Sequence, residues 1–225
     1  MTVATLLTLR DDFKRRLNAD VKSLVRLYDQ NDGGRGRPGD WMIPLRKSAL
    51  VLVASNLEYF LESTVCCGFE HLVDRDVVAR KYPEGFRLWR FRSQAHMRNL
   101  SVDHAKELVE LSQKLYSDVR PLTREEIVVE NIKDQFANPT PKNVNWLMRL
   151  VDIEDYCDIR SVTVGGNAMN ITVGLGELAQ RRNDVAHGGD QEVPTMEDVK
   201  RLSKFAQLLS TRFMRDVSSA IERCV

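Results

Sequence analysis

Four residues near the end of the sequence, Arg182, Asn183, Asp184 and His187, have types and a spacing that suit proton transfer. Side chains three or four residues apart are neighbours on a helix, so Asn183 and Asp184 can both contact His187. The next residue, Gly188, favours a left-handed helix end, which places His187 in the last turn. There the helix dipole favours the protonated imidazole. Because the ordinary pKa of histidine is about 6.5, a small upward shift would let His187 act as a general acid or base near neutral pH.

Arg182 lies in the middle of an apolar stripe on the helix that we expect over 170–187. The stripe consists of Ile171, Leu175, Leu178 and Val185. A cation at that position is unfavourable unless it is paired or faces a cleft or a subunit boundary. Two interpretations are open: a salt-bridged arginine with a histidine that caps the helix end, or a pair that acts on a substrate. From the residues alone the structural interpretation is favoured, because isolated pairs of arginine and histidine are rarely catalytic.

The string from Arg182 to His187, followed by glycine, resembles the Arg-polar-x-x-x-His motif of the HEPN superfamily. The sequence Asn-Pro-Thr-Pro-Lys-Asn at 138–143 is similar to a segment of prokaryotic toxin-type HEPN domains, notably the RiboL-PSP and related branches. The resemblance is specific over about 136–189 and generic elsewhere. It implies an all-α helical bundle that ends in a long amphipathic helix.

Many HEPN proteins are metal-independent endoribonucleases that act as dimers, and the resemblance implies the same activity here. It makes Arg182 and His187 the catalytic pair and Asn183 a positioning residue, with no cofactor and no metal. Cleavage of RNA through its 2′-hydroxyl needs a base, an acid and positive charge on the phosphate. A guanidinium presents donors that match a phosphate. One chain offers one histidine in the motif, so a two-fold homodimer would supply both acid and base.

The resemblance to toxin-type domains also implies a biological setting. It points to a toxin or effector of a prokaryotic toxin–antitoxin or antiphage defence system, with an antitoxin or another defence protein as partner. Some toxin relatives carry a tyrosine, a site of inhibitory modification, two places after the histidine; Gly189 stands there in this chain, which argues against that control. The alternative function is a non-catalytic helical module that binds RNA, a nucleotide or a protein. A third interpretation is a structural oligomerisation domain.

Further substrate contacts are expected from Arg181 and Asp184 beside the motif, and from a basic and aromatic stretch at 80–98. Within that stretch the arginines singled out for RNA are Arg87, Arg90 and Arg92. Cations for phosphates and aromatic faces for bases suit single-stranded RNA. The favoured alternative is a solvated loop, an irregular insertion in the domain, whose aromatic side chains pack into the core.

The rest of the chain is expected to be helical, with glycine and proline separating the helices. Apolar residues three and four apart predict long amphipathic helices near both ends of the chain and a core helix between them. The expected helices cover 3–30, 44–67, 101–118, 142–155 and 170–187, with one from a capping box at Thr123 and a last one from Thr195. Residues 69–81 either continue the core helix or form a short one. Around 159–174 a short β-hairpin and an irregular loop are equally favoured. These elements predict one all-α domain of HEPN type over 1–225.

Composition sets broad limits on function. The 225 residues include 33 Lys and Arg and 32 Asp and Glu, and the net charge of +1 excludes nucleic-acid affinity spread over the whole surface. The four cysteines have no metal-ligand spacing and are expected to be reduced. We find no uncharged apolar stretch of about 18 residues and no secretory leader, so we expect a cytoplasmic protein that does not contact a membrane.

Overall fold

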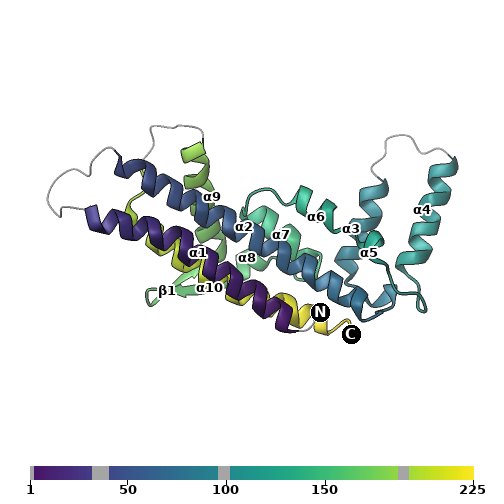
Figure 1. Ribbon diagram of the computed structural model, residues 1–225. Helices are drawn as coiled ribbons and strands as arrows, with labels where there is room; N and C mark the ends of the chain where they lie inside the picture. Colours follow the sequence, from purple (N-terminus) through teal and green to yellow (C-terminus); the bar gives the residue numbers. More distant parts are fainter. Residues whose placement is uncertain (1–2, 32–40, 96–101, 187–192) are drawn as a thin grey trace.

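The structure, a computed structural model, describes residues 3–31, 41–95, 102–186 and 193–225, and these are built almost entirely from helices (Figure 1). The all-α class predicted from the sequence is confirmed. The elements in chain order are α1 (Val3–Asn31), α2 (Met42–Asp74), η1 (Ala79–Lys81), α3 (Glu84–Ala95), α4 (Val102–Leu115), α5 (Arg124–Ile127), α6 (Val129–Gln135), α7 (Pro141–Arg149), α8 (Tyr156–Ile159), β1 (Ser161–Val164), β2 (Asn167–Asn170), α9 (Ile171–Ala186) and α10 (Met196–Glu222).

Three long helices, α1, α2 and α10, lie along one another and form the centre of the molecule (Figure 1). α2 packs against both of the others and buries side chains along most of its length. Gly68 lets α2 and α10 approach closely, because a Cβ atom there would lie 2.9 Å from Ile221 Cγ1. The core helix expected over 44–67 is therefore confirmed, and it continues through Gly68 to Asp74.

α2 is also the one helix in the described ranges that is long and apolar enough to cross a membrane, with a mean hydropathy of 1.3 in its most apolar window. The central helix of a bundle meets the same conditions of length and composition. Half of that window is buried inside the molecule, and α1, α9 and α10 all contact the helix. The packing of α2 is therefore that of a core helix.

A short antiparallel hairpin occupies 161–170, so the hairpin is the alternative that the structure confirms. β1 pairs with β2 from Ser161 opposite Asn170 to Val164 opposite Asn167. The turn residues Gly165 and Gly166 have φ of 58° and 88°, a left-handed geometry that tight hairpins require and glycine adopts at little cost. β1 packs on α10, and β2 leads directly into α9.

The helix expected over 142–155 is shorter than its sequence suggests. It begins at Pro141, where Thr140 Oγ1 accepts a hydrogen bond from the backbone N–H of Asn143, and it ends at Arg149. Asp152 follows with a φ of 58°, in the left-handed region that ends a helix. The predicted C-terminal end of this helix was wrong, because the spacing of apolar side chains does not show where the backbone turns into the left-handed region.

Residues 80–98 are ordered where the structure describes them, and form η1 and α3 rather than an irregular segment. Asp152 stabilises the start of α3, since its carboxylate oxygens accept hydrogen bonds from the backbone N–H groups of Glu84 and Gly85 at 2.9 and 2.7 Å. Gly85 is required for this approach, because a Cβ atom there would lie 1.8 Å from the backbone oxygen of Arg149. The turn after α7 thus caps a helix that precedes it by more than fifty residues.

Candidate active site

α9 carries the arginine of the motif, and its first turns anchor it to the core. Ile171, Leu175 and Leu178 are fully buried, while Val185 is half-buried and packs against the core. The helix contacts α2, α7 and α10. The apolar stripe expected from the sequence is therefore present, and Arg182 lies on the part of α9 nearest its C-terminal end.

Arg181 is held by carboxylates from two helices. Its Nε donates to Glu177 Oε1 at 3.0 Å, and its Nη2 lies 3.4 Å from Asp198 Oδ1. Arg201 of α10 binds the same two carboxylates, with Nη1 2.9 Å from Glu177 Oε2 and Nη2 3.3 Å from Asp198 Oδ1. The hydrogen bond from Arg201 holds the pKa of Glu177 below its ordinary range. We call Glu177, Arg181, Asp198 and Arg201 the α9–α10 ion-pair cluster; its charges balance, so Arg181 serves the packing of two helices.

Arg182, the next residue, is half-buried and stands outside that cluster. Its Nη1 lies 3.5 Å from Asn183 Oδ1, a long hydrogen bond. None of the carboxylates in the described ranges forms an ion pair with it. A guanidinium has five N–H donors, so most of those on Arg182 remain open to an anion. Among the residues that the structure describes, two adjacent arginines on one helix therefore have different environments: Arg181 forms ion pairs with carboxylates, and Arg182 forms none.

Asn183 links Arg182 to the turn before α7. Its Oδ1 accepts a second long hydrogen bond from Asn138 Nδ2, also at 3.5 Å. Asn138 has a left-handed backbone with φ of 69°, and Asn143 Nδ2 donates to its backbone oxygen at 3.0 Å. The Oδ1 atom of Asn138 is buried and has no hydrogen-bond partner in the described part of the chain. Sequence reasoning did not select Asn138 as a site residue, although the 138–143 similarity was the signal that could have done so.

For the two other members of the predicted motif, Asp184 and His187, the structure shows fewer contacts or none. Asp184 is half-buried on α9. His187 lies outside the described residues, and its predicted contacts with Asn183 and Asp184 stay predictions. The structure thus brings together Arg182, Asn183 and Asn138 between α9 and the turn before α7.

In a comparison with known protein families, the model of RiboL-PSP-HEPN matches residues 15–222. The chain belongs to the RiboL-PSP-HEPN family. Comparison with curated proteins gave no match, and comparison with solved structures gave none either. The matched range includes both the Asn138 turn and α9, the two parts that meet at Asn183. Membership of this HEPN family supports a nuclease or RNA-related module.

The arginines of the 80–98 stretch lie far from the motif of this HEPN chain, because α3 and the C-terminal end of α9 are at opposite ends of the molecule (Figure 1). Arg90 is buried, and its Nε donates to the backbone oxygen of Glu126 at 3.0 Å. Arg87 lies over the ring of Tyr116 at 4.6 Å, and Arg92 is exposed. The aromatic residues Tyr82, Phe86 and Trp89 are buried in the core. Core packing, the favoured alternative, is therefore what the structure shows for these rings.

No group of three or more His, Cys, Asp or Glu side chains in the described ranges could hold a metal ion. The four cysteines are free, and burial raises the pKa of the Cys66 thiol to about 12. Cys66 is thus a buried, unreactive thiol rather than a nucleophile. The chemistry that this HEPN chain offers at α9 is that of arginine and amide side chains, with the histidine of the motif.

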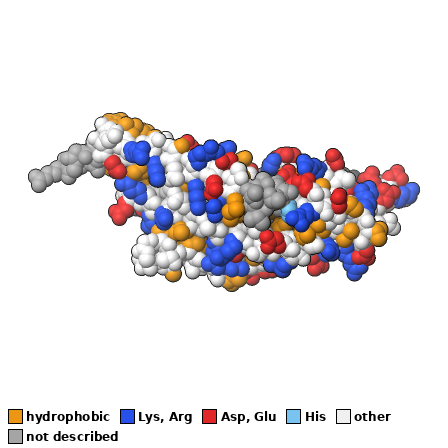
Figure 2. Space-filling model, turned by 60° about the horizontal axis from the view of Figure 1, so that its bottom comes forward, with side chains coloured by type: hydrophobic (Ala, Val, Ile, Leu, Met, Phe, Trp, Pro, Cys, Tyr) orange, Lys and Arg blue, Asp and Glu red, His pale blue; other side chains and the backbone are white. Residues whose placement is uncertain are grey.

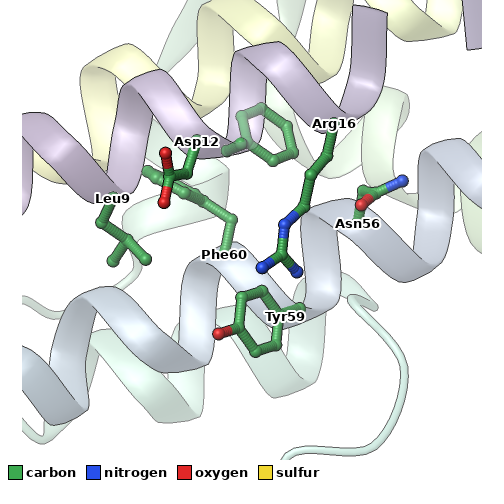
Figure 3. A pocket seen from close by; sticks show the side chains of 7 residues that line it. Leu9, Asp12, Arg16, Asn56, Tyr59 and Phe60 are labelled. Atoms are coloured by element: carbon green, nitrogen blue, oxygen red, sulfur yellow. The ribbon is translucent and has the colours of Figure 1, made fainter. Parts of the chain in front are cut away.

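A small pocket between α1 and α2 is not a substrate site. Figure 3 shows that Arg16 and Asp12 of α1 point over it and that Tyr59 of α2 forms its other wall. The Arg16 guanidinium lies 5.1 Å from the centre of the Tyr59 ring. The cavity volume of about 30 Å³ has room for two or three water molecules, since each needs about 10–15 Å³ of such space. A nucleotide does not fit there.

Proposed function

We propose that this HEPN protein is a metal-independent endoribonuclease whose active site is built around Arg182, with His187 and Asn183. The observation that carries this proposal is the difference between the two adjacent arginines. Arg181 is neutralised by Glu177 and Asp198, whereas Arg182 is half-buried and pairs with no carboxylate in the described ranges. A half-buried cation without a carboxylate is unfavourable unless an anion completes its environment. A phosphate of RNA would do so with the fork geometry that suits arginine.

In the proposed reaction the 2′-oxygen of a ribose attacks the adjacent phosphorus atom. A base removes the proton of the 2′-hydroxyl, the bond from phosphorus to the 5′-oxygen breaks, and an acid gives that oxygen a proton. The products are a 2′,3′-cyclic phosphate and a 5′-hydroxyl, so atoms and charge balance. Arg182 would stabilise the charge that builds up on the phosphate oxygens, where such stabilisation has its largest effect. His187 would carry one of the two proton transfers.

Two proton transfers need two groups, and the motif provides one histidine for each chain. A two-fold homodimer with both motifs at its interface would supply the second. We further propose that the protein acts in the cytoplasm as a toxin or effector of a prokaryotic toxin–antitoxin or antiphage defence system, with an antitoxin or defence protein as partner. The family membership and the open donors of Arg182 support this role, with RNA as the proposed substrate.

The test is cleavage of a labelled RNA under single-turnover conditions in excess chelator. We expect the wild type to leave 2′,3′-cyclic phosphate ends and Arg182→Ala to slow cleavage by about 10²-fold or more, the cost typical of removing one group that stabilises developing charge. Arg182→Lys keeps the charge but loses the fork, so it should also be impaired. The control Arg75→Ala removes an exposed arginine at the end of α2 and should cleave normally. Absence of turnover in the wild type, or equal rates in all variants, would favour the non-catalytic module.

A further inference from the structure

An open groove of about 560 Å³ lies between β1 and the second half of α10. Three arginines line it: Arg10 from α1 and Arg212 and Arg215 from α10. Its other walls carry the hydroxyl groups of Ser161, Thr163 and Thr211. The remaining lining is apolar and consists of Val162, Leu208 and Met214. The groove thus combines cations, hydroxyl groups and an apolar floor.

The arginines in and beside the groove outnumber the carboxylates that pair with them. Asp216 lies 3.6 Å from both Arg212 Nε and Arg215 Nε, and 3.8 Å from Arg160 Nη1. One carboxylate thus serves three arginines. Arg10 is paired with the exposed Asp11 at 2.9 Å. Four arginines and two carboxylates leave a local excess of two positive charges, in a chain whose net charge is +1.

The wall behind Arg212 contains polar atoms that the described part of the chain leaves unsatisfied. They are buried and have no hydrogen-bond partner: Tyr156 Oη, Arg160 Nε, Arg212 Nε and Asp216 Oδ2. These groups are neighbours, since Arg160 lies over the Tyr156 ring at 5.3 Å and both arginines pair with Asp216. Asp216 lies 3.6 to 3.8 Å from these arginines, beyond hydrogen-bond distance, so it offsets their charge without satisfying their donors.

A hydrogen bond joins the two walls of the groove. Arg212 Nη1 donates to the backbone oxygen of Ser161 at 3.1 Å, which ties α10 to the hairpin. Arg215, by contrast, has a side chain that is 67% exposed and can turn toward a ligand. On the face shown in Figure 2, basic and acidic side chains both occur along most of the molecule.

We propose that this groove binds the phosphate backbone of single-stranded RNA. An open groove with arginines from two helices and hydroxyl groups on its walls fits an extended chain of phosphates and riboses, and its apolar floor gives the bases a surface to stack on. The choice of RNA rests on the proposed function. The groove is a site separate from Arg182, because β2 leads into the opposite end of α9. At 1.5 Å per residue, Ile171 and Arg182 are about 16 Å apart along the helix axis.

The test measures binding without cleavage. The probe is a fluorescein-labelled single-stranded RNA of 20 nucleotides with 2′-O-methyl groups, which cannot react through the 2′-hydroxyl. Fluorescence anisotropy gives the Kd at several salt concentrations for the wild type and for the double variant Arg10→Gln/Arg215→Gln. Each phosphate contact of a single strand contributes about 0.7 to the salt slope. The variant should lose about 1.4 from the slope and bind on the order of tenfold more weakly at 0.15 M salt.

The control is Arg26→Gln/Arg223→Gln, which removes the same charge from exposed positions on α1 and just after α10, outside the groove. We expect its Kd and salt slope to stay near those of the wild type. Equal weakening in both double variants, or in neither, would overturn the groove proposal even if RNA cleavage is established. Selective weakening in the groove variant without any cleavage by the wild type would leave the groove proposal standing and remove the nuclease. Thermal melts would be used to check that both double variants are folded.

Discussion

Asn138 and Asn183, which are 45 residues apart in the sequence, are joined by a hydrogen bond of 3.5 Å from Nδ2 to Oδ1. The same Oδ1 atom accepts from Arg182 Nη1. Asn183 therefore connects Arg182, which forms no ion pair within the described ranges, to the turn before α7. This makes Asn138 a positioning residue for the proposed active site, because it acts on Arg182 through Asn183.

Asn138→Gly should separate positioning from folding. Glycine adopts the observed φ of 69° at no steric cost, so the free energy of unfolding should change by less than about 1 kcal/mol. The loss of the amide leaves Asn183 free to rotate, and we expect kcat for RNA cleavage to fall by about tenfold while KM changes little. Steady-state kinetics and a thermal melt check both parts.

The control for Asn138 is Asn145→Gly, which also removes an amide near α7. Asn145 donates to Asp158 Oδ2 and does not contact Asn183. It should lower the melting temperature without a selective loss of kcat. If the two variants lost activity in proportion to stability, Asn138 would have no positioning role.

Ionisation of Glu62 should lower the free energy of unfolding as the pH rises. Burial, and then the neighbouring Glu58, raise the pKa of Glu62 from 4.5 to about 7. The folded state therefore holds this proton more tightly than the unfolded state. Its contribution is fully present below about pH 4.5 and is lost as the pH rises through 7. Glu62→Gln removes the charge and should raise the melting temperature at pH 8.

We expect a gain of about 2–4 °C for Glu62→Gln at pH 8, about 1 kcal/mol for a chain of this size after allowing for the solvent that reaches this half-buried group. The gain should approach zero at pH 4, where both states are protonated. Glu110→Gln, at an exposed position on α4, is the control and should give no gain at either pH. A gain for Glu62→Gln that does not depend on pH would contradict the titration.

Two glycines of α9 should respond oppositely to the same substitution. A Cβ atom at Gly174 would lie 2.4 Å from the ring of Phe205, which is fully buried in α10, whereas one at Gly176 would meet nothing within 4 Å. Gly174→Ala should therefore destabilise the protein by about 2 kcal/mol through overpacking. Gly176→Ala should stabilise it by about 0.5–1 kcal/mol, because alanine is the better helix former. Chemical denaturation measures both, and effects of the same sign would refute this account of the contact between α9 and α10.

Local signals in the sequence predicted their structures well. The capping box predicted at Thr123 is present, with the backbone N–H of Thr123 3.0 Å from Glu126 Oε2. The last helix also begins just after Thr195, as the sequence predicts. The apolar stripe of α9 is equally local and was found from spacing alone.

Contacts between residues far apart in the chain could not be predicted from the sequence. Nothing about Asp152 indicated that it caps α3 at Glu84, 68 residues away. The same holds for the site: spacing identified Arg181 and Arg182 as a pair of candidates, but only packing against α10 shows that Asp198 neutralises the first of them. Which of two adjacent arginines is open to a ligand depends on a helix that follows later in the chain.

Three arginines share Asp216, and Arg10 pairs with Asp11, so four arginines and two carboxylates leave an excess of two positive charges around the groove. The rest of the chain, in a molecule with a total of +1, carries one net negative charge. We therefore expect the groove to attract a polyanion although the molecule as a whole is almost neutral. Association rates should fall as ionic strength rises, since the screening length is about 8 Å at 0.15 M salt.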